Sequence, residues 1–178
     1  MIDVVTCRGL PSLRPLASIA DKYPDGGGWL ERRFDDLARG RGEIAALMSG
    51  PSAAAWAIVT PKGMRRHKLS TFLVAPHARH RGLGRSLLAW LQARWWAEEI
   101  ERVHVTVDEL DLATRRFFEA NGFSLAGGEG VDYGPGRRDL VYLWSASAYR
   151  PSAEMIFRSQ LNARRRFISA PTSGSTAF

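Results

Sequence analysis

The stretch that decides the fold is Phe72-Leu-Val-Ala-Pro-His-Ala-Arg-His-Arg-Gly-Leu-Gly-Arg-Ser-Leu-Leu88. It opens with an apolar run typical of a strand end, passes through a basic turn, and continues into a pattern of apolar residues at helical spacing. The first N–H groups of a helix have no internal acceptors and carry partial positive charge, and glycines let a phosphate approach the backbone closely. Arg79, Arg81 and Arg85 add charge at the same turn. The stretch therefore predicts a diphosphate site.

Two common phosphate-binding motifs do not fit this turn. No Gly-Lys-Ser/Thr follows the glycines, so it is not a Walker loop. The three-glycine spacing of a dinucleotide fingerprint is also absent, and the turn lies in the middle of the chain instead of after the first strand.

Strands and helices are predicted to alternate on both sides of this turn. Apolar alternation and turn residues predict strands over 1–6, 43–49, 53–60, 67–74, 102–107, from 123 and over 140–144. Helical spacing predicts helices over 10–23, 29–37, from 85, over 111–121 and over 151–167, with a break at 25–28. This order indicates an α/β or α+β fold, a sheet with helices on its faces.

Length and composition indicate one globular domain. The chain has 178 residues, of which 45% are hydrophobic and 24% charged, enough to bury a core without disulfides. The longest uncharged apolar run, 53–59, is too short for a membrane span, and the first residues do not resemble a signal peptide. The single Cys7 excludes an internal disulfide, and the four histidines lack metal-ligand spacing. We expect a cytoplasmic protein without a metal site or a membrane partner.

The chain is strongly basic. Its net charge is +7, and lysine occurs only at Lys22, Lys62 and Lys68, so arginine supplies nearly all of the 25 basic residues. The planar guanidinium of arginine suits phosphates and carboxylates. The charge favours anionic partners such as a nucleotide cofactor, nucleic acid or an acidic peptide.

Two motifs resemble the GNAT family of N-acetyltransferases. Arg79-x-x-Gly82-x-Gly84 is similar to the family's Q/R-x-x-G-x-G/A pattern, and Asp111 to Phe123 resembles its N-x-x-A-x-x-L-Y-x-x-x-G-F segment. The resemblance implies a mixed, mostly antiparallel central sheet flanked by helices and splayed at an acetyl-CoA site. We expect one such domain over 1–147 and a basic extension over 148–178, partly helical and partly flexible.

The resemblance also implies which residues hold acetyl-CoA. The pantetheine arm would bond to the open backbone of Phe72, Leu73 and Val74, Asp111 would lie near it, and Phe117 and Phe118 would flank the thioester. The diphosphate would bind at Arg79, His80, Arg81, Gly82, Leu83, Gly84 and Arg85.

The catalytic positions depart from the family pattern. Phe118 takes the place of the tyrosine that protonates the leaving thiolate, and it has no proton to give. Strand alternation predicts that Lys68, Ser70 and Phe72 share one face, with His67 and Thr71 on the other. The resemblance implies that Lys68 and Ser70 stand where some members of the family carry a general base. Neither is a good base, and positioning alone could suffice. The other hypothesis is a loop acid, Tyr133, with Asp132 or Asp108 as base.

Three functions remain open. The first is an N-acetyltransferase that uses acetyl-CoA as co-substrate and a small-molecule or peptide amine as acceptor. The second keeps the chemistry but takes aminoacyl-tRNA as acceptor, which the charge allows and the missing tyrosine disfavours. The third is a non-catalytic acyl-CoA-binding module, which Phe118 would explain. A homodimer is compatible with each.

Overall fold

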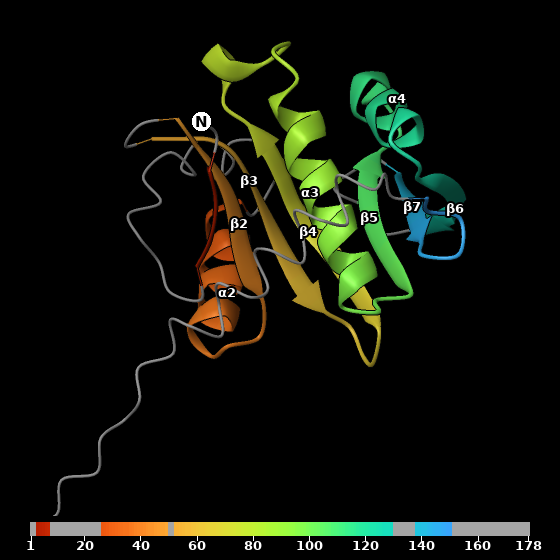
Figure 1. The fold of residues 1–178 in the computed structure, drawn as a ribbon, viewed down its shortest axis with the longest axis horizontal. Coiled ribbons are helices and arrows are strands. Elements are labelled where there is room, and N and C mark those ends of the chain that lie inside the picture. The colour runs from red at the N-terminus through yellow and green to blue at the C-terminus, as the bar shows by residue number, and fades with distance from the viewer. Residues whose placement is uncertain (1–2, 8–25, 50–51, 130–137, 151–178) are drawn as a thin grey trace, which may run out of the picture.

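The computed structural model describes residues 3–7, 26–49, 52–129 and 138–150. Within these ranges the strands form one seven-stranded sheet in the order β1-β2-β3-β4-β5-β7-β6 (Figure 1). The strands are β1 (Asp3–Cys7), β2 (Glu43–Ser49), β3 (Ser52–Pro61), β4 (Arg66–Val74), β5 (Arg102–Asp108), β6 (Ser124–Glu129) and β7 (Asp139–Ser145). All neighbours pair antiparallel except β4 and β5. The predicted mixed, mostly antiparallel sheet is confirmed.

The helices lie close to the predicted ranges. They are α2 (Gly26–Ala38), the single 3₁₀ turn η2 (Pro76–Ala78), α3 (Leu83–Ala97) and α4 (Leu112–Ala120). The predicted break at 25–28 is wrong, because α2 begins at Gly26; glycines in a first turn forgo only a modest helix propensity. The helices predicted over 10–23 and 151–167 lie outside the described residues.

Helices α3 and α4 cover one face of the sheet. Val103, Val105 and Val107 of β5 are buried there, and Trp95 of α3 packs against Trp144 of β7 with ring centroids 5.4 Å apart. The side chain of Gln92 on α3 donates to the carbonyl of Asn121 at the end of α4 over 2.6 Å. Helix α2 lies behind β2, on the opposite face from α3 (Figure 1).

Helix α3 rests on small side chains. Arg94 on α3 pairs with Glu43 at the start of β2 (Nη1 to Oε1 2.7 Å), so the alternate residues of β2 also face α3. The residues at these positions and their partners on β3 include Ala45, Ala55 and Ala57, all fully buried. The fully buried leucines of α3 belong to the same core cluster: Leu87, Leu88 and Leu91. We call the three alanines the alanine floor.

Strands β4 and β5 separate toward the end where α3 begins. Their parallel pairing runs from Arg66 opposite Arg102 only as far as Lys68 opposite His104. Beyond Lys68 one edge of β4 is left without a strand partner among the described residues, whereas the other edge stays paired with β3 up to Val74. This is the predicted splay.

A bulge in β4 changes which side chains face the splay. The register passes from Leu69 opposite Val59 to Thr71 opposite Ile58, which leaves Ser70 as an extra residue. After the bulge the alternation is reversed, so Phe72 meets the rings of α4 and Val74 lies near Gly84 of α3. The expectation that Ser70 and Phe72 share a face is therefore wrong. Ser70 and Thr71 instead both lie on the face opposite α3.

Candidate active site

The glycine turn before α3 has an unusual backbone. His80 and Gly82 have φ of 58° and 77°, with Arg79 at −67° and Arg81 outside the left-handed region. Residues with alternating signs of φ aim successive N–H groups into one concavity, which binds anions. Gly82 caps α3 without a side-chain hydrogen bond, and a Cβ added to it would meet no atom of the described residues within 4 Å. The turn can therefore cradle an anion against the free N–H groups of the first helical turn.

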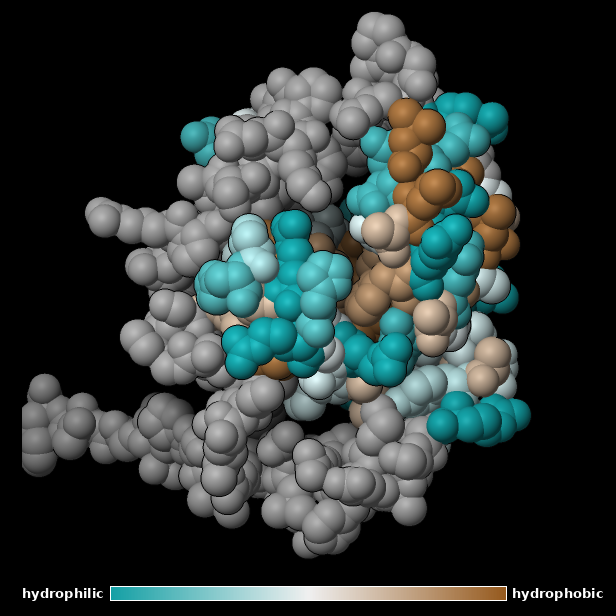
Figure 2. Space-filling view, turned by 90° about the horizontal axis from the view of Figure 1, so that it is seen from above, coloured by the Kyte–Doolittle hydropathy of each residue, from teal (hydrophilic) through white to brown (hydrophobic). Residues whose placement is uncertain are grey.

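One arginine of the motif has a structural partner. The Nε of Arg79 donates to the carbonyl of Val74 over 3.2 Å, so this side chain ties the turn to the end of β4. Arg81 and Arg85 are exposed, as is His80. Seen from above, this end of the molecule carries a hydrophilic cluster over η2 and the turn, and a hollow separates it from hydrophobic atoms at the start of α4 (Figure 2).

The free edge of β4 offers backbone groups to a ligand. The N–H of Ala75 donates to the carbonyl of Ala54 on β3 over 2.9 Å. Because backbone groups alternate along a strand, the peptide groups of Val74 and Phe72 point to the opposite edge, where β5 has separated. Those of Leu73 point to β3. Both backbone groups of Phe72 and the N–H of Val74 therefore face the open edge, whereas the Val74 carbonyl already accepts from Arg79.

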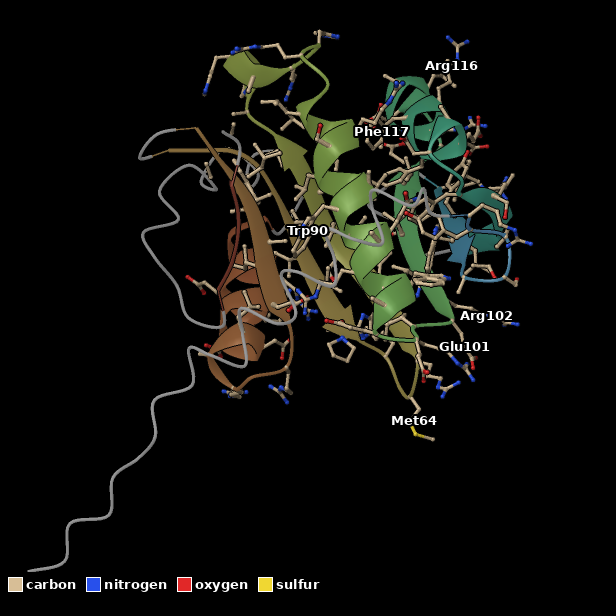
Figure 3. The ribbon with its side chains drawn as sticks, in the orientation of Figure 1. Met64, Trp90, Glu101, Arg102, Arg116 and Phe117 are labelled. Carbon is tan, nitrogen blue, oxygen red and sulfur yellow. The ribbon has the colours of Figure 1, made fainter. Side chains whose placement is uncertain are left out.

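An aromatic wall of three phenylalanines closes the splay beside this edge. The ring of Phe72 lies 5.5 Å from that of Phe117 and 6.0 Å from that of Phe118, and these two lie 5.3 Å apart. Phe117 points between α4 and α3, whereas Arg116 points outward (Figure 3). A Cβ added at Gly84 would lie 3.1 Å from Val74 Cγ2 and 3.6 Å from Phe117, so this glycine lets α3 approach the wall.

The family's acid position is apolar and buried. Phe118 is 2% exposed and also packs against Phe123, with centroids 5.1 Å apart. No group of the aromatic wall can hold or give a proton. Tyr133, the loop acid predicted from the sequence, and Asp132 lie outside the described residues.

Asp111 acts as the cap of α4. Its carboxylate accepts from the backbone N–H of Thr114 over 3.0 Å and from the Thr114 hydroxyl over 2.7 Å. A carboxylate has no N–H to donate, unlike the asparagine that the family pattern has here. These contacts indicate that Asp111 positions α4, and its predicted contact with pantetheine stays a prediction.

Polar side chains line the face of β3 and β4 opposite α3. The Ser70 and Thr60 hydroxyls lie 2.9 Å apart, and the neighbouring Thr71 hydroxyl is buried with no hydrogen-bond partner in the described part of the chain. Lys68, opposite Thr60 in the register, is half-buried on the same face. Asp108, at the end of β5, accepts from the N–H of Leu110 over 2.9 Å.

The structure thus brings most predicted residues to one end of the sheet, with Ser70 on the opposite face from the aromatic wall. Sequence reasoning missed Thr60 and the tie between Arg79 and Val74. The only sequence signal for Thr60 is that a polar residue ends the apolar run 53–59.

Two absences hold for the residues that the structure describes. In these ranges no helix combines the length and apolar character needed to cross a membrane. The same ranges contain no group of three or more histidine, cysteine, aspartate or glutamate side chains that could hold a metal ion.

Comparison with protein families gives one match. The model of the acetyltransferase (GNAT) family matches residues 10–123, which include the glycine turn and the segment from Asp111 to Phe123. No curated protein matches the chain in sequence.

Solved structures share the fold at low sequence identity. An acetyltransferase of the GNAT family from Desulfovibrio desulfuricans is 20% identical with a TM-score of 0.69, over 82% of this chain and 99% of that one. A GNAT acetyltransferase from Elizabethkingia anophelis with acetyl-CoA bound is 10% identical with a TM-score of 0.65, over 81% and 97%. The ribosomal-protein-S18-alanine N-acetyltransferase from Escherichia coli is 19% identical with a TM-score of 0.62, over 83% and 97%.

Proposed function

The chain belongs to the GNAT family of acetyltransferases, and on this premise we propose that it moves an acetyl group from acetyl-CoA to the nitrogen of a small-molecule or peptide amine. Acetyl-CoA-dependent acetyl transfer is the chemistry of the family. The observation that carries the proposal is the glycine turn beside a splayed β4, which joins an anion cradle to free backbone groups in one place. One of the solved neighbours has acetyl-CoA bound, in agreement with this cofactor.

Each part of the site would hold one part of acetyl-CoA. The N–H groups of the turn and of the first turn of α3 would bind the diphosphate, with Arg81 and Arg85 adding charge. The backbone groups of Phe72 and the N–H of Val74 would bond to the amides of the pantetheine arm, as a peptide adds to a sheet edge. The aromatic wall would then exclude water from the thioester.

The reaction would proceed by direct attack. The neutral amine nitrogen forms a bond to the thioester carbonyl carbon, the C–S bond breaks, and coenzyme A leaves as a thiolate. A thiol has a pKa of about 8.5, so the thiolate leaves near neutral pH without an obligatory acid, consistent with Phe118 at the acid position. The amine proton passes to water, and the protein contributes positioning, which can supply a large part of the rate enhancement.

The cofactor site is tested by a charge in the glycine turn. In Gly82→Asp a carboxylate would occupy the space of the phosphate, so we expect the affinity for acetyl-CoA in calorimetry to fall about 100-fold or more, on the order of 3 kcal/mol. Gly40→Asp is the matched control. Gly40 also has a positive φ (70°) and open space around an added Cβ among the described residues, but it follows the end of α2 instead of preceding α3. Equal affinities of the two variants would contradict the proposed site.

The acceptor is tested by a turnover screen. Acetyl-CoA is incubated with small primary amines, with peptides bearing free N-termini or lysines, and with aminoacyl-tRNA, and the release of coenzyme A is measured. Acetylation of an amine or peptide supports the proposal. Acetylation of aminoacyl-tRNA alone, with binding that weakens as salt rises, would replace it with the tRNA function.

The second candidate function is an acyl-CoA-binding module without catalysis. The observation that favours it is the phenylalanine at the acid position, which leaves the aromatic wall without a proton donor. Tight binding of acetyl-CoA with no turnover on any member of the screen would establish this function in place of the enzyme.

A further inference from the structure

We propose that Thr60 is a positioning residue that holds the Ser70 hydroxyl in place to receive the acceptor amine. The inference rests on the proposed function and assigns a task to a residue on a neighbouring strand. Its basis is the bulge in β4, the hydrogen bond between the two hydroxyls, the burial of Thr60 and the half-buried position of Ser70.

The bulge gives Ser70 a place that a regular strand would not. It is the extra residue opposite Val59 and Ile58, and it lies two residues beyond Lys68, where the pairing of β4 with β5 ends. Its side chain lies on the face opposite the aromatic wall. An amine that approaches the thioester from that face meets Ser70 before it reaches the wall.

Thr60 fixes the orientation of this hydroxyl. Its Oγ1 lies 2.9 Å from the Ser70 Oγ, and Thr60 is only 6% exposed. A hydroxyl has one proton and two lone pairs. When Ser70 donates its proton to Thr60, both of its lone pairs remain for an N–H of the amine, which turns the nitrogen lone pair toward the thioester carbonyl. Ser70 takes no proton, because the amine proton passes to water.

Thr71 provides a matched comparison. It is 8% exposed and lies next to Ser70 on the same face, and its hydroxyl has no hydrogen-bond partner among the residues that the structure describes. Thr60→Val and Thr71→Val are the same change of shape at two buried β-branched positions. Only the first removes a partner of Ser70.

The experiment uses the full chain and the amine that the wild type acetylates fastest in the screen. We expect Thr60→Val to lower kcat about three- to tenfold, the value of one hydrogen bond, with the KM for acetyl-CoA unchanged. The kcat of Thr71→Val should stay within about twofold of the wild type, and Thr60→Ser should keep the wild-type kcat. In a Ser70→Ala background, Thr60→Val should not lower kcat further.

Several outcomes would overturn the inference. Equal kcat in Thr60→Val and Thr71→Val would do so. An effect of Thr60→Val on the KM for acetyl-CoA or on Tm that Thr60→Ser does not rescue would also do so, because it would indicate that Thr60 only stabilises the bulge. If Thr60→Val does not fold, Thr60→Ala and Thr71→Ala repeat the comparison. A wild type without turnover on any amine overturns the proposed function as well, whereas turnover with equal variants overturns this inference alone.

Discussion

Phe118 is the residue at which the chain differs most informatively from its family. Its ring is enclosed by those of Phe72, Phe117 and Phe123, and it has no acidic proton to donate to a leaving group. If the thioester lies at this wall, a hydroxyl added there would face the leaving sulfur. We expect Phe118→Tyr to raise kcat, by at most the roughly 10²-fold that a placed acid contributes.

Phe123→Tyr is the control, since it adds the same hydroxyl to a ring that packs against Phe118. Phe123 is also buried (3% exposed), and its ring lies beyond Phe118 as seen from Phe72. A rate unchanged in Phe118→Tyr, together with a slow Tyr133→Phe enzyme whose KM for acetyl-CoA stays constant, would identify Tyr133 as the donor. Full activity in both variants would leave catalysis to positioning alone.

At this scale the sequence predicted the position of the glycine turn better than the faces of β4. The glycine turn was predicted because its chemistry is local, contained within Arg79 to Arg85. The faces of Ser70 and Phe72 were predicted wrongly, because alternation assumes a regular strand and no residue type marks the bulge. The bond between Thr60 and Ser70 depends on that bulge and on the pairing of two strands.

Helix α4 is the element that carries the aromatic wall, and two groups fix it. Asp111 caps its first turn, and the Tyr142 hydroxyl on β7 donates to Glu119 over 2.7 Å while accepting from Arg115 over 3.2 Å. The order of the strands and helices was predictable from apolar periodicity and glycine positions. The partners of α4 were not, since Tyr142 and Glu119 are joined by the fold alone.

The cap predicts a stability effect at the helix. Asp111→Ala removes both acceptors of Thr114, so we expect a loss of about 1 kcal/mol and a Tm lower by about 2–4 °C in thermal unfolding. Asp111→Asn keeps an oxygen in the cap and should stay near the wild type. An asparagine variant as unstable as the alanine variant would instead show that the negative charge itself matters, which a cap does not require.

At the scale of the whole molecule, α3 joins the site to a charged cluster at the far end of the sheet. There Arg94 meets Glu43 and Glu98, and His67 lies at the start of β4. Burial lowers the pKa of His67 below its ordinary value of 6.5, against the raising effect of the two glutamates and with a smaller lowering from Arg94. The folded protein therefore favours the neutral form of this histidine more than the unfolded chain does.

The depressed pKa predicts how stability depends on pH. Below pH 6.5 the unfolded chain binds a proton at His67 more readily than the folded one, so the free energy of unfolding should fall from pH 6.5 downward through the folded pKa. Tm measured between pH 7.5 and 5 should decline less in His67→Gln than in the wild type. His77→Gln, at an exposed position, should leave the slope as it is, and equal slopes in all three proteins would contradict the assignment.

The alanine floor has a consequence for anyone who seeks altered cofactor affinity by random mutagenesis. A valine in place of Ala45, Ala55 or Ala57 adds two methyl groups at a fully buried position beneath the helix, and we expect α3 to make room by rising from the sheet. The glycine turn rises with it, while β4 stays where β3 holds it. Variants that bind the nucleotide poorly should therefore include substitutions beneath α3 that do not contact the nucleotide. The distance of α3 from the sheet is a quantity that redesign can adjust.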